Sequence, residues 1–378
     1  MSFSALGLSE RLLQVISNQG FTQPFPIQKE VIPAIIQKMD VLGIAKTGSG
    51  KTAGYVLPIL MNQPQAKETK TRYLNTLVLV PTRELAMQVV DVFKLFGQGD
   101  SEPIKAKAVF GGVSINPQMK GMLGVKILVA TPGRLLELVE ANAVHISEIE
   151  TLVLDEADEM LKLGFKDEMD RIFTLLPKKR QNLLFSATLS EEIKKIEQLL
   201  LNNPLVIKIN EEKDAIDLIQ QEAYFVDEQK KGPLLRYLIK SKDMQQVLVF
   251  VSSIQKADHV ANKLRNNGIE AWPIHSKKSQ GARTDLLTKF KHGKLRVLVT
   301  TDLLARGIDI EFLPYVINYE LPRSPKDFIH RIGRTGRAQS PGMAMSLITP
   351  DEVQHFKVIL KKMGKYVPGI DGNELLNP

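Results

Sequence analysis

The 378-residue chain contains no cysteine and only one tryptophan. Without cysteine there can be no disulfide framework, no thiolate metal site and no cysteine nucleophile, so nothing in the sequence requires an oxidising compartment. Long apolar runs are also missing: none approaches the roughly 20 residues that span a bilayer, and the N-terminus lacks the basic and apolar regions of a signal peptide. We therefore expect a cytoplasmic protein with no membrane partner.

Positive charge, in contrast, is in excess. The chain has 50 lysines and arginines against 42 acidic residues, which gives a formal charge of +8 and suits a polyanionic partner such as nucleic acid. Hydrophobic residues make up 43% of the chain, too many for general disorder, and the length is sufficient for two globular domains.

Short apolar runs alternate with longer segments of helical period, as is typical of buried parallel strands joined by helices. A first series of apolar runs occupies residues 41–45, 76–80, 126–130, 151–154, 182–185 and 205–209. A polar segment interrupts this rhythm, and a second series follows at 246–251, 296–300 and 315–319. The sequence predicts an α/β fold of two tandem doubly wound parallel-sheet domains joined by a short linker.

The predicted boundaries follow from the change in composition between the two series. We expect an N-terminal domain over 1–209, a linker over 210–221, a C-terminal domain over 222–365 and a short tail over 366–378. Trp272 lies in the apolar run EAWPI and is predicted to belong to the core of the second domain.

The segment AKTGSGKT, residues 45–52, nearly matches the phosphate-binding pattern G-x-x-x-x-G-K-[ST]. It follows a predicted strand and precedes a segment of helical pattern, which is where backbone N–H groups can cradle a phosphate. Lys51 can reach the β- and γ-phosphates of a nucleotide, and Thr52 can hold Mg²⁺. Ala45 replaces the first glycine at the end of the strand, where a small residue suffices. The predicted loop consists of Ala45, Thr47, Gly48, Ser49, Gly50, Lys51 and Thr52, with positive φ at Gly48 and Gly50.

A second motif is acidic, and it supplies the metal ligand and the water-activating group that a phosphate loop needs. In TLVLDEAD, residues 151–158, four apolar residues deliver Asp155 and Glu156 to the carboxyl end of a predicted strand. Asp155 is expected to complete the Mg²⁺ shell, and Glu156 to orient and polarise the attacking water. Together the two motifs indicate an ATPase or a GTPase.

These motifs belong to a longer series that resembles the DEAD-box RNA helicases, and most closely the small bacterial branch of that family. The series covers both predicted domains in the family's order. Besides the two motifs above it comprises GFTQPFPIQ (20–28), PTRELA (81–86), GG (111–112), TPGR (131–134), SAT (186–188), ARGID (305–309) and HRIGRTGRA (330–338). The resemblance implies two RecA-like domains, ATP-dependent RNA helicase activity, and ATP and Mg²⁺ as cofactors.

The resemblance further implies an adenine pocket upstream of the phosphate loop. Phe21 can stack on a purine, and the Gln28 amide offers a donor and an acceptor that fit adenine and not guanine. From the second domain, Arg334 and Arg337 resemble arginine fingers, and their spacing of three predicts one helical turn that presents both on one face. By the same resemblance His330 would couple this site to the DEAD segment and Asp309 would hold the ribose.

Predicted RNA contacts divide between the two domains. In the first domain they fall at strand ends and helix starts, where backbone N–H groups and arginines can bind phosphates, and are Pro81, Thr82, Arg83, Gly111, Gly112, Thr131 and Arg134. In the second domain the resemblance implies contacts at the family's equivalent positions, Ser252, Ser253, Gln280, Arg283 and Thr301. No set of base-reading residues is evident, so we expect binding that is largely independent of sequence. Ser186 and Thr188 are predicted to hydrogen-bond Asp158 and to couple ATP and RNA binding.

Some positions differ from the residues common in the family, namely Phe25, Lys46 and Ser276, but they leave the expected reaction class intact. The main alternative is an ATP-gated RNA clamp, or a remodelling factor with little processive unwinding, whose task is stable binding with hydrolysis used for release. A DNA-translocating helicase fits less well, because the adenine motif and the DEAD segment resemble the RNA family.

Overall fold

The computed structural model describes residues 2–45, 48–63, 72–98, 104–209, 219–302, 313–335 and 342–376. The chain divides into two compact units, Met1–Asn210 and Glu211–Pro378, and each has a sheet and an apolar core of its own. None of the helices within these ranges is long and apolar enough to cross a bilayer.

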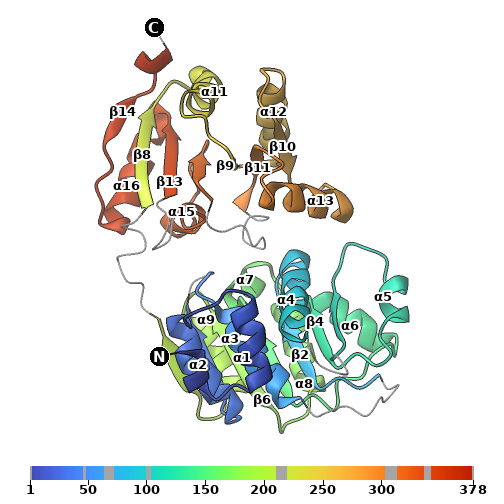
Figure 1. Cartoon of the computed structure of the whole chain (residues 1–378). Helices are drawn as coiled ribbons and strands as arrows, with labels where there is room; N and C mark the ends of the chain where they lie inside the picture. Colours follow the sequence, from blue (N-terminus) through green and yellow to red (C-terminus); the bar gives the residue numbers. More distant parts are fainter. Residues whose placement is uncertain are drawn as a thin grey trace. The chain divides into compact units, whose positions relative to one another are not determined.

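The first unit is built on a seven-stranded parallel sheet with the order β3-β4-β2-β5-β6-β1-β7 (Figure 1). Its strands are β1 (Val41–Ile44), β2 (Thr76–Leu79), β3 (Ala106–Val109), β4 (Ile127–Ala130), β5 (Thr151–Leu154), β6 (Gln181–Ser186) and β7 (Leu205–Lys208). Its helices are η1 (Phe3–Leu6), α1 (Glu10–Asn18), α2 (Pro26–Ile36), α3 (Lys51–Asn62), α4 (Arg83–Phe96), α5 (Asn116–Lys120), α6 (Pro132–Glu140), α7 (Ala157–Lys162), α8 (Lys166–Leu175) and α9 (Glu191–Leu200).

The continuous apolar character of these strands follows from burial on both faces. Successive side chains of a strand point to opposite faces of a sheet, so Val78 packs with α1 to α4 while its neighbours Leu77 and Leu79 pack with α6 to α9. Helices on both faces of the sheet make this the doubly wound architecture that the sequence predicts.

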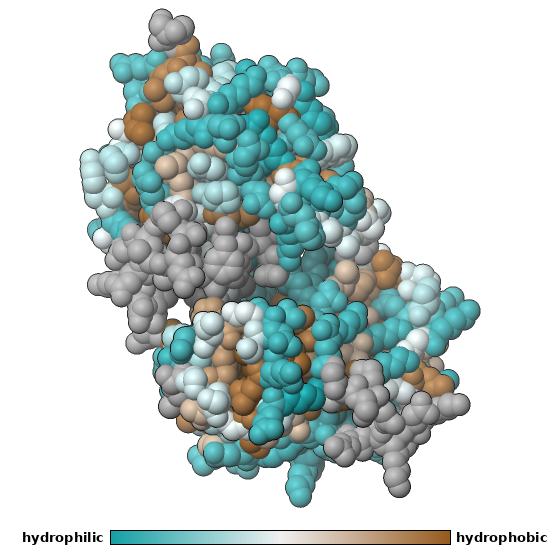
Figure 2. Space-filling view, viewed as in Figure 1, coloured by the Kyte–Doolittle hydropathy of each residue, from teal (hydrophilic) through white to brown (hydrophobic). Residues whose placement is uncertain are grey.

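The second unit repeats the plan with the strand order β10-β11-β9-β12-β13-β8-β14. Its strands are β8 (Ile219–Phe225), β9 (Val247–Phe250), β10 (Ala271–Ile274), β11 (Val297–Thr300), β12 (Tyr315–Asn318), β13 (Gly342–Ile348) and β14 (Gly369–Asp371). Its helices are η2 (Glu228–Lys230), α11 (Lys231–Ser241), α12 (Ile254–Arg265), α13 (Gln280–Lys291), α15 (Pro325–Ile332), η3 (Pro350–Glu352), α16 (Val353–Met363) and η4 (Glu374–Leu376). Hydrophilic side chains cover much of the coloured surface in Figure 2, as expected when helices shield both faces of each sheet.

The structure differs from the sequence predictions at the edges of the second unit. Residues 219–221, assigned to the linker, open β8, and residues 369–371, assigned to the tail, form β14, which pairs with β8. Both segments lack a continuous apolar run, the pattern from which the sequence predicts strands. Trp272 is also not a core residue: it lies on the edge strand β10, is 42% exposed, and packs under the Arg265 guanidinium at 4.8 Å from the ring centroid.

The amino ends of β1 and β6 are tied to the turn before β7 by one carboxylate, that of Asp40. Its Oδ1 accepts a hydrogen bond from the backbone N–H of Asn182 at 2.7 Å, and its Oδ2 accepts one from the backbone N–H of Asn202 at 2.8 Å. Since Asp40 is only 9% exposed, removal of the carboxylate would leave buried donors unsatisfied.

We predict that Asp40→Ala lowers the free energy of unfolding of the first unit by about 3 kcal/mol, because two buried N–H groups lose charged acceptors. Urea unfolding followed by far-UV circular dichroism tests this. Fluorescence of Trp272, the single tryptophan, reports on the second unit in the same samples. An unchanged circular dichroism transition would show that Asp40 does not tie these strands together.

Candidate functional site

The predicted phosphate loop lies between β1 and α3, at the carboxyl edge of the first sheet. Gly48 and Gly50 have φ angles of 81° and 86°, which confirms the prediction of left-handed backbone at both positions. Gly50 also has no room for a side chain, because a Cβ there would lie 2.6 Å from Gln28 Nε2 and 2.7 Å from the Phe25 ring. Backbone geometry and packing therefore both require glycine at position 50.

Two polar groups of this loop are buried. Lys51 is 6% exposed, and its ammonium donates a hydrogen bond to the Ala45 carbonyl at the end of β1. The Ser49 hydroxyl is buried and has no hydrogen-bond partner among the described residues. The buried ammonium and the unsatisfied hydroxyl belong to one loop, and an anionic ligand there could accept hydrogen bonds from both. Thr47, another predicted member of the loop, lies outside the described residues.

The acidic pair lies two strands away in the sheet, where β5 ends and α7 begins. Asp155 is 2% exposed, and its Oδ1 has no hydrogen-bond partner in the described part of the chain. Burial raises the pKa of Asp155, and the charge of Lys51 opposes that rise. Glu156 adopts left-handed backbone with φ 53° and ψ 47°, a conformation that costs a residue other than glycine about 1–3 kcal/mol.

Tyr55 is a site residue that the sequence analysis missed. Its hydroxyl donates a hydrogen bond to Asp155 Oδ2 at 2.9 Å, and its ring packs on Phe185 with 5.4 Å between centroids. Burial raises the pKa of Tyr55 and the Asp155 carboxylate raises it further, so the hydroxyl keeps its proton. Its spacing from Lys51 could have indicated this role, because residues four positions apart on a helix lie on the same face of that helix.

These atoms fit a nucleotide phosphate with a divalent cation. Asp155 Oδ1 offers a carboxylate oxygen, the donor type that Mg²⁺ prefers, and the unsatisfied Ser49 hydroxyl with Lys51 offers donors to phosphate oxygens. Thr52 lies on the first turn of α3, and its side chain is close enough to lower the pKa of the same Tyr55 hydroxyl that holds Asp155.

Phe21 and Gln28, the two residues predicted to bind adenine, are only partly free to contact a base. The Gln28 side chain accepts a hydrogen bond from the Phe25 backbone and donates one to the Gly50 carbonyl, both at 3.0 Å. These bonds use half of the capacity of the amide and tie it to the phosphate loop. Phe21 is 45% exposed and lies 6.2 Å from the Phe96 ring, so one face can receive a base.

The SAT segment begins at the last residue of β6, the strand between β5 and β1. The Thr188 hydroxyl donates to Asp158 Oδ2 at 3.0 Å, which confirms the predicted contact, and the Ala187 N–H donates to Oδ1 at 3.3 Å. For Ser186 the prediction was wrong. Its hydroxyl donates to the Thr188 carbonyl at 2.7 Å, because a serine side chain readily closes a turn on the backbone two residues on.

The other half of the same sheet edge carries the predicted RNA contacts of the first unit. Thr82 caps α4, its hydroxyl accepting a hydrogen bond from the Leu85 N–H at 3.2 Å. Pro81 precedes it, and Arg83 opens α4. The Arg83 guanidinium lies 3.1 Å from the position that a Cβ on Gly112 would occupy. The loops after β2 and β3 are thus in contact, with an arginine between them.

Arg134 does not present its charge as predicted. It is 6% exposed, donates a hydrogen bond to the Val113 carbonyl at 2.8 Å and pairs with Glu137 at 2.9 Å. The neighbouring Thr131 hydroxyl accepts a hydrogen bond from the Gly111 N–H at 3.4 Å. The TPGR segment therefore fixes the shape of the loop after β3, which contains Gly111 and Gly112. Arg134 positions that loop more than it binds phosphate itself.

In the second unit the predicted contacts also follow strand ends. Ser252 and Ser253 follow β9, and Thr301 follows β11, which pairs with β9. The N–H and the hydroxyl of Ser252 both donate to Glu320 Oε2 at 2.7 Å, so a carboxylate already occupies these donors. Arg283 is 1% exposed, which contradicts the expectation of an accessible phosphate ligand. The side chain of Gln280 is outside the described part of the structure.

Arg334, one of the two predicted arginine fingers, does not lie on helix α15. Helix α15 ends at Ile332, with His330 in its last turn, and Arg334 lies beyond the glycine that caps the helix. Arg334 is 6% exposed. Arg337 and Asp309 lie outside the described residues.

Arg331, which the sequence analysis did not select, is the arginine that holds this region together. It is 2% exposed, and its guanidinium donates to Asp302 at 2.5 and 2.8 Å, to Asn318 at 3.2 Å and to the Glu320 carbonyl at 2.6 Å. These bonds join α15 to the ends of β11 and β12. The sequence HRIGRTGR offers several arginines and gives no signal of which one is structural.

We predict that Tyr55→Phe lowers the free energy of unfolding of the first unit by about 1–3 kcal/mol, because Asp155 Oδ2 loses its donor. The variant should also need several times more Mg²⁺ to bind a fluorescent nucleotide, because the carboxylate is no longer held. Tyr73→Phe is the matched control, since Tyr73 is 38% exposed. Equal effects of the two substitutions would show that Tyr55 is not part of the site.

Comparison with known proteins gives the family. The model of the DEAD/DEAH box helicase family matches residues 25–196, and that of the helicase conserved C-terminal domain matches residues 229–339. The chain is 37% identical over 362 residues to the ATP-dependent RNA helicase CshA of Limosilactobacillus reuteri, over 96% of this chain and 72% of the relative. It is 37% identical over 375 residues to the DEAD-box ATP-dependent RNA helicase CshA of Bacillus cereus, over 99% of this chain and 70% of the relative.

Solved structures agree with this assignment. S. cerevisiae Dbp5 bound to RNA and ADP BeF3 is 28% identical and covers 99% of this chain and 96% of its own, with a TM-score of 0.85. A DEAD box protein from Methanococcus jannaschii is 34% identical and covers 98% of this chain and 99% of its own, with a TM-score of 0.57. The tandem sheets are therefore RecA-like domains, and the chain belongs to the DEAD-box family of superfamily 2 helicases and is an ATP-dependent RNA helicase.

Proposed function

We propose that this chain uses ATP hydrolysis to separate short RNA duplexes locally, with ATP and RNA each held by both units. One observation carries the proposal. A single sheet edge bears the phosphate loop, the SAT segment and the acidic pair at the ends of β1, β6 and β5, and the loops suited to an RNA backbone at the ends of β2, β4 and β3. The contact between Thr188 and Asp158 lies in the ATP half of that edge. Binding or hydrolysis of the nucleotide could thus alter the loops of the RNA half through the adjacent strands.

In the proposed ATP site, Lys51 exchanges the Ala45 carbonyl for phosphate oxygens, and the Ser49 hydroxyl gains the partner that it lacks. Thr52 and Asp155 would hold Mg²⁺, which when bound would neutralise charge on the phosphates. Glu156, whose backbone is held in the left-handed conformation at the start of α7, would orient the attacking water. Phe21 and Gln28 would bind the adenine.

The second unit would complete this site in the proposed closed state. Arg334 and Arg337 would neutralise charge on the γ-phosphate, His330 would contact the DEAD segment and Asp309 the ribose. The buried network around Arg331 supports this proposal, since it fixes the end of α15, from which Arg334 follows directly.

The proposed RNA contacts are to the backbone and the 2′-hydroxyls, and so are largely independent of sequence. Capped helix starts at Thr82 and Ser253 place backbone N–H groups where phosphates can bind. Closure of both units on one strand would bend it in a way that a duplex cannot follow, and release of phosphate would reopen the protein. We place this activity in the cytoplasm.

Hydrolysis and strand separation measured on the same preparation test the proposal. We expect multiple-turnover ATP hydrolysis that RNA stimulates and DNA does not, together with unwinding of a short RNA duplex. An RNA clamp would instead bind single strands stably in the presence of ATP without unwinding. Hydrolysis unaffected by RNA would contradict both.

We predict that Lys51→Ala and Glu156→Gln fail in different ways. Lys51→Ala should weaken ATP binding, because its buried ammonium is the cation of the phosphate loop. Glu156→Gln should bind ATP with nearly normal affinity and remain on RNA, because only the orientation of water is lost. Binding of a fluorescent nucleotide and single-turnover hydrolysis distinguish them. Equal ATP affinity in the two variants would contradict these assignments.

A further inference from the structure

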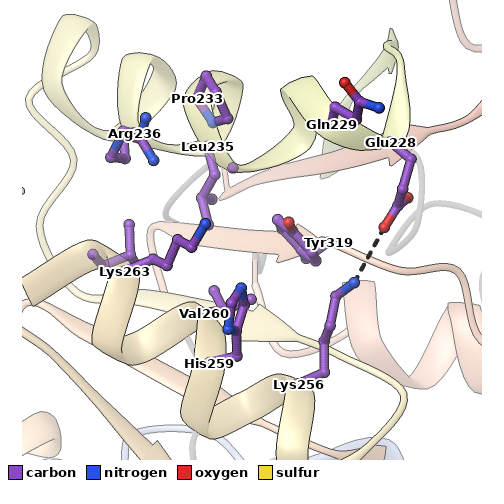
Figure 3. A pocket seen from close by; sticks show the side chains of 12 residues that line it. Glu228, Gln229, Pro233, Leu235, Arg236, Lys256, His259, Val260, Lys263 and Tyr319 are labelled. Carbon is purple, nitrogen blue, oxygen red and sulfur yellow. Dashed lines mark hydrogen bonds and ion pairs between the residues drawn. The ribbon is translucent and has the colours of Figure 1, made fainter.

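The second unit contains a cavity of about 320 Å³ between η2 and α11 on one side and α12 on the other. Tyr319, which directly follows β12, lies between the helices (Figure 3). We call this cavity the α11–α12 pocket. None of its lining residues belongs to the proposed ATP site or to the proposed RNA contacts, so the pocket has no role in the function described above.

The pocket carries a surplus of positive charge. Lys256 pairs with the Glu228 carboxylate at 3.1 Å and also lies 3.6 Å from Glu320. Arg236 and Lys263 also line the pocket, but neither has an ion-pair partner among the residues that the structure describes. In Figure 3 the side chain of Lys263 extends from α12 toward α11. Two cations therefore face the cavity without a neutralising carboxylate.

Two hydrogen-bond donors of this pocket lie near one position beside Gly232. A Cβ added to Gly232 would lie 3.8 Å from Arg236 Nη1 and 4.0 Å from the Tyr319 hydroxyl oxygen. Burial raises the pKa of Tyr319, so its hydroxyl is protonated and can donate. A guanidinium and a phenol that both lie within about one contact distance of the same position suit an anionic oxygen such as that of a phosphate.

The pocket continues a surface that begins at the RNA edge. Ser253, a proposed RNA contact, caps α12, and the residues of α12 that line the pocket recur every three or four positions from Lys256 to Lys263. Ten residues of helix separate Ser253 from Lys263, a rise of about 15 Å. One face of α12 thus leads from the proposed RNA contacts into the pocket.

We propose that the α11–α12 pocket binds a phosphate of the RNA strand where that strand continues beyond the contacts at the sheet edge. The inference rests on the proposed role of Ser253 in RNA binding. Arg236, Lys263 and the Tyr319 hydroxyl would hold the phosphate, and because they touch only the backbone they add affinity without sequence preference. RNA that reaches the pocket binds more tightly than RNA that covers only the edge.

The test uses the full chain and the double variant Arg236→Ala/Lys263→Ala. Affinity is measured over a salt series for a short single strand that saturates RNA-stimulated hydrolysis, and for the same strand extended at both ends. Each phosphate contact contributes about 0.7 to the slope of log K against log salt for a single strand, and the pocket holds one phosphate, so the double variant should lose about 0.7 for the extended strand. Its affinity for the short strand should not change.

Two further variants distinguish phosphate binding in the pocket from a general effect of protein charge on RNA affinity. Lys240→Ala/Lys357→Ala removes the same charge from exposed residues outside the pocket and should leave the salt slope unchanged. Gly232→Leu fills the space between Arg236 and Tyr319 without a change in charge, and should weaken binding of the extended strand alone.

The outcomes keep this inference distinct from the proposed function. If the wild type binds both strands and the pocket variants match the control pair, the pocket inference is wrong while the proposed function stands. If the wild type binds neither strand, both are wrong. A slope loss confined to the extended strand, in the pocket variants only, supports the inference.

Discussion

The parallel pairing of β1, β5 and β6 is the constraint on which the rest of the first unit depends. These strands come from distant parts of the chain, yet the register pairs Ile44 with Ser186 and Leu154 with Leu184. Because the pairing is parallel, the phosphate loop, the acidic pair and the SAT segment all emerge at one edge of the sheet. No contact between the three motifs would exist without that register, and the pairing of β2 with β5 adds the loops suited to RNA.

The site is held in arrangements that cost stability. Asp155 and Lys51 are charged groups buried beside one another, the Ser49 hydroxyl is unsatisfied, and Glu156 has left-handed backbone. Burial of the charges, the unsatisfied hydroxyl and the left-handed backbone each cost stability, and in the proposed manner of binding a nucleotide would relieve or use each of them. The surrounding apolar strands of the first unit supply the stability that tolerates them.

Much of this site could be predicted from sequence, because short motifs fix local geometry. The left-handed glycines at positions 48 and 50 and the contact between Thr188 and Asp158 follow from residue type and spacing. What could not be predicted depends on competition between partners. Ser186 prefers a nearby carbonyl to Asp158, and Arg134 is taken by the Val113 carbonyl, so neither side chain reaches its expected target. The buried network of Arg331 joins residues from separate elements, and no local pattern reveals it; the spacing of Tyr55 from Lys51 indicates its side of the helix but not its bond to Asp155.

The hydrogen bond between Thr188 and Asp158 is the most direct test of the claim that one sheet edge joins nucleotide and RNA. RNA-stimulated ATP hydrolysis and unwinding of a short RNA duplex should be measured together for Thr188→Ala and Ser186→Ala. We predict that Thr188→Ala retains most of its hydrolysis but unwinds about 5 to 150 times more slowly, the range of a coupling of 1–3 kcal/mol. Ser186→Ala, which loses only contacts within its own turn, should be milder. A proportional fall of both activities in Thr188→Ala, or no change in either, would contradict the account.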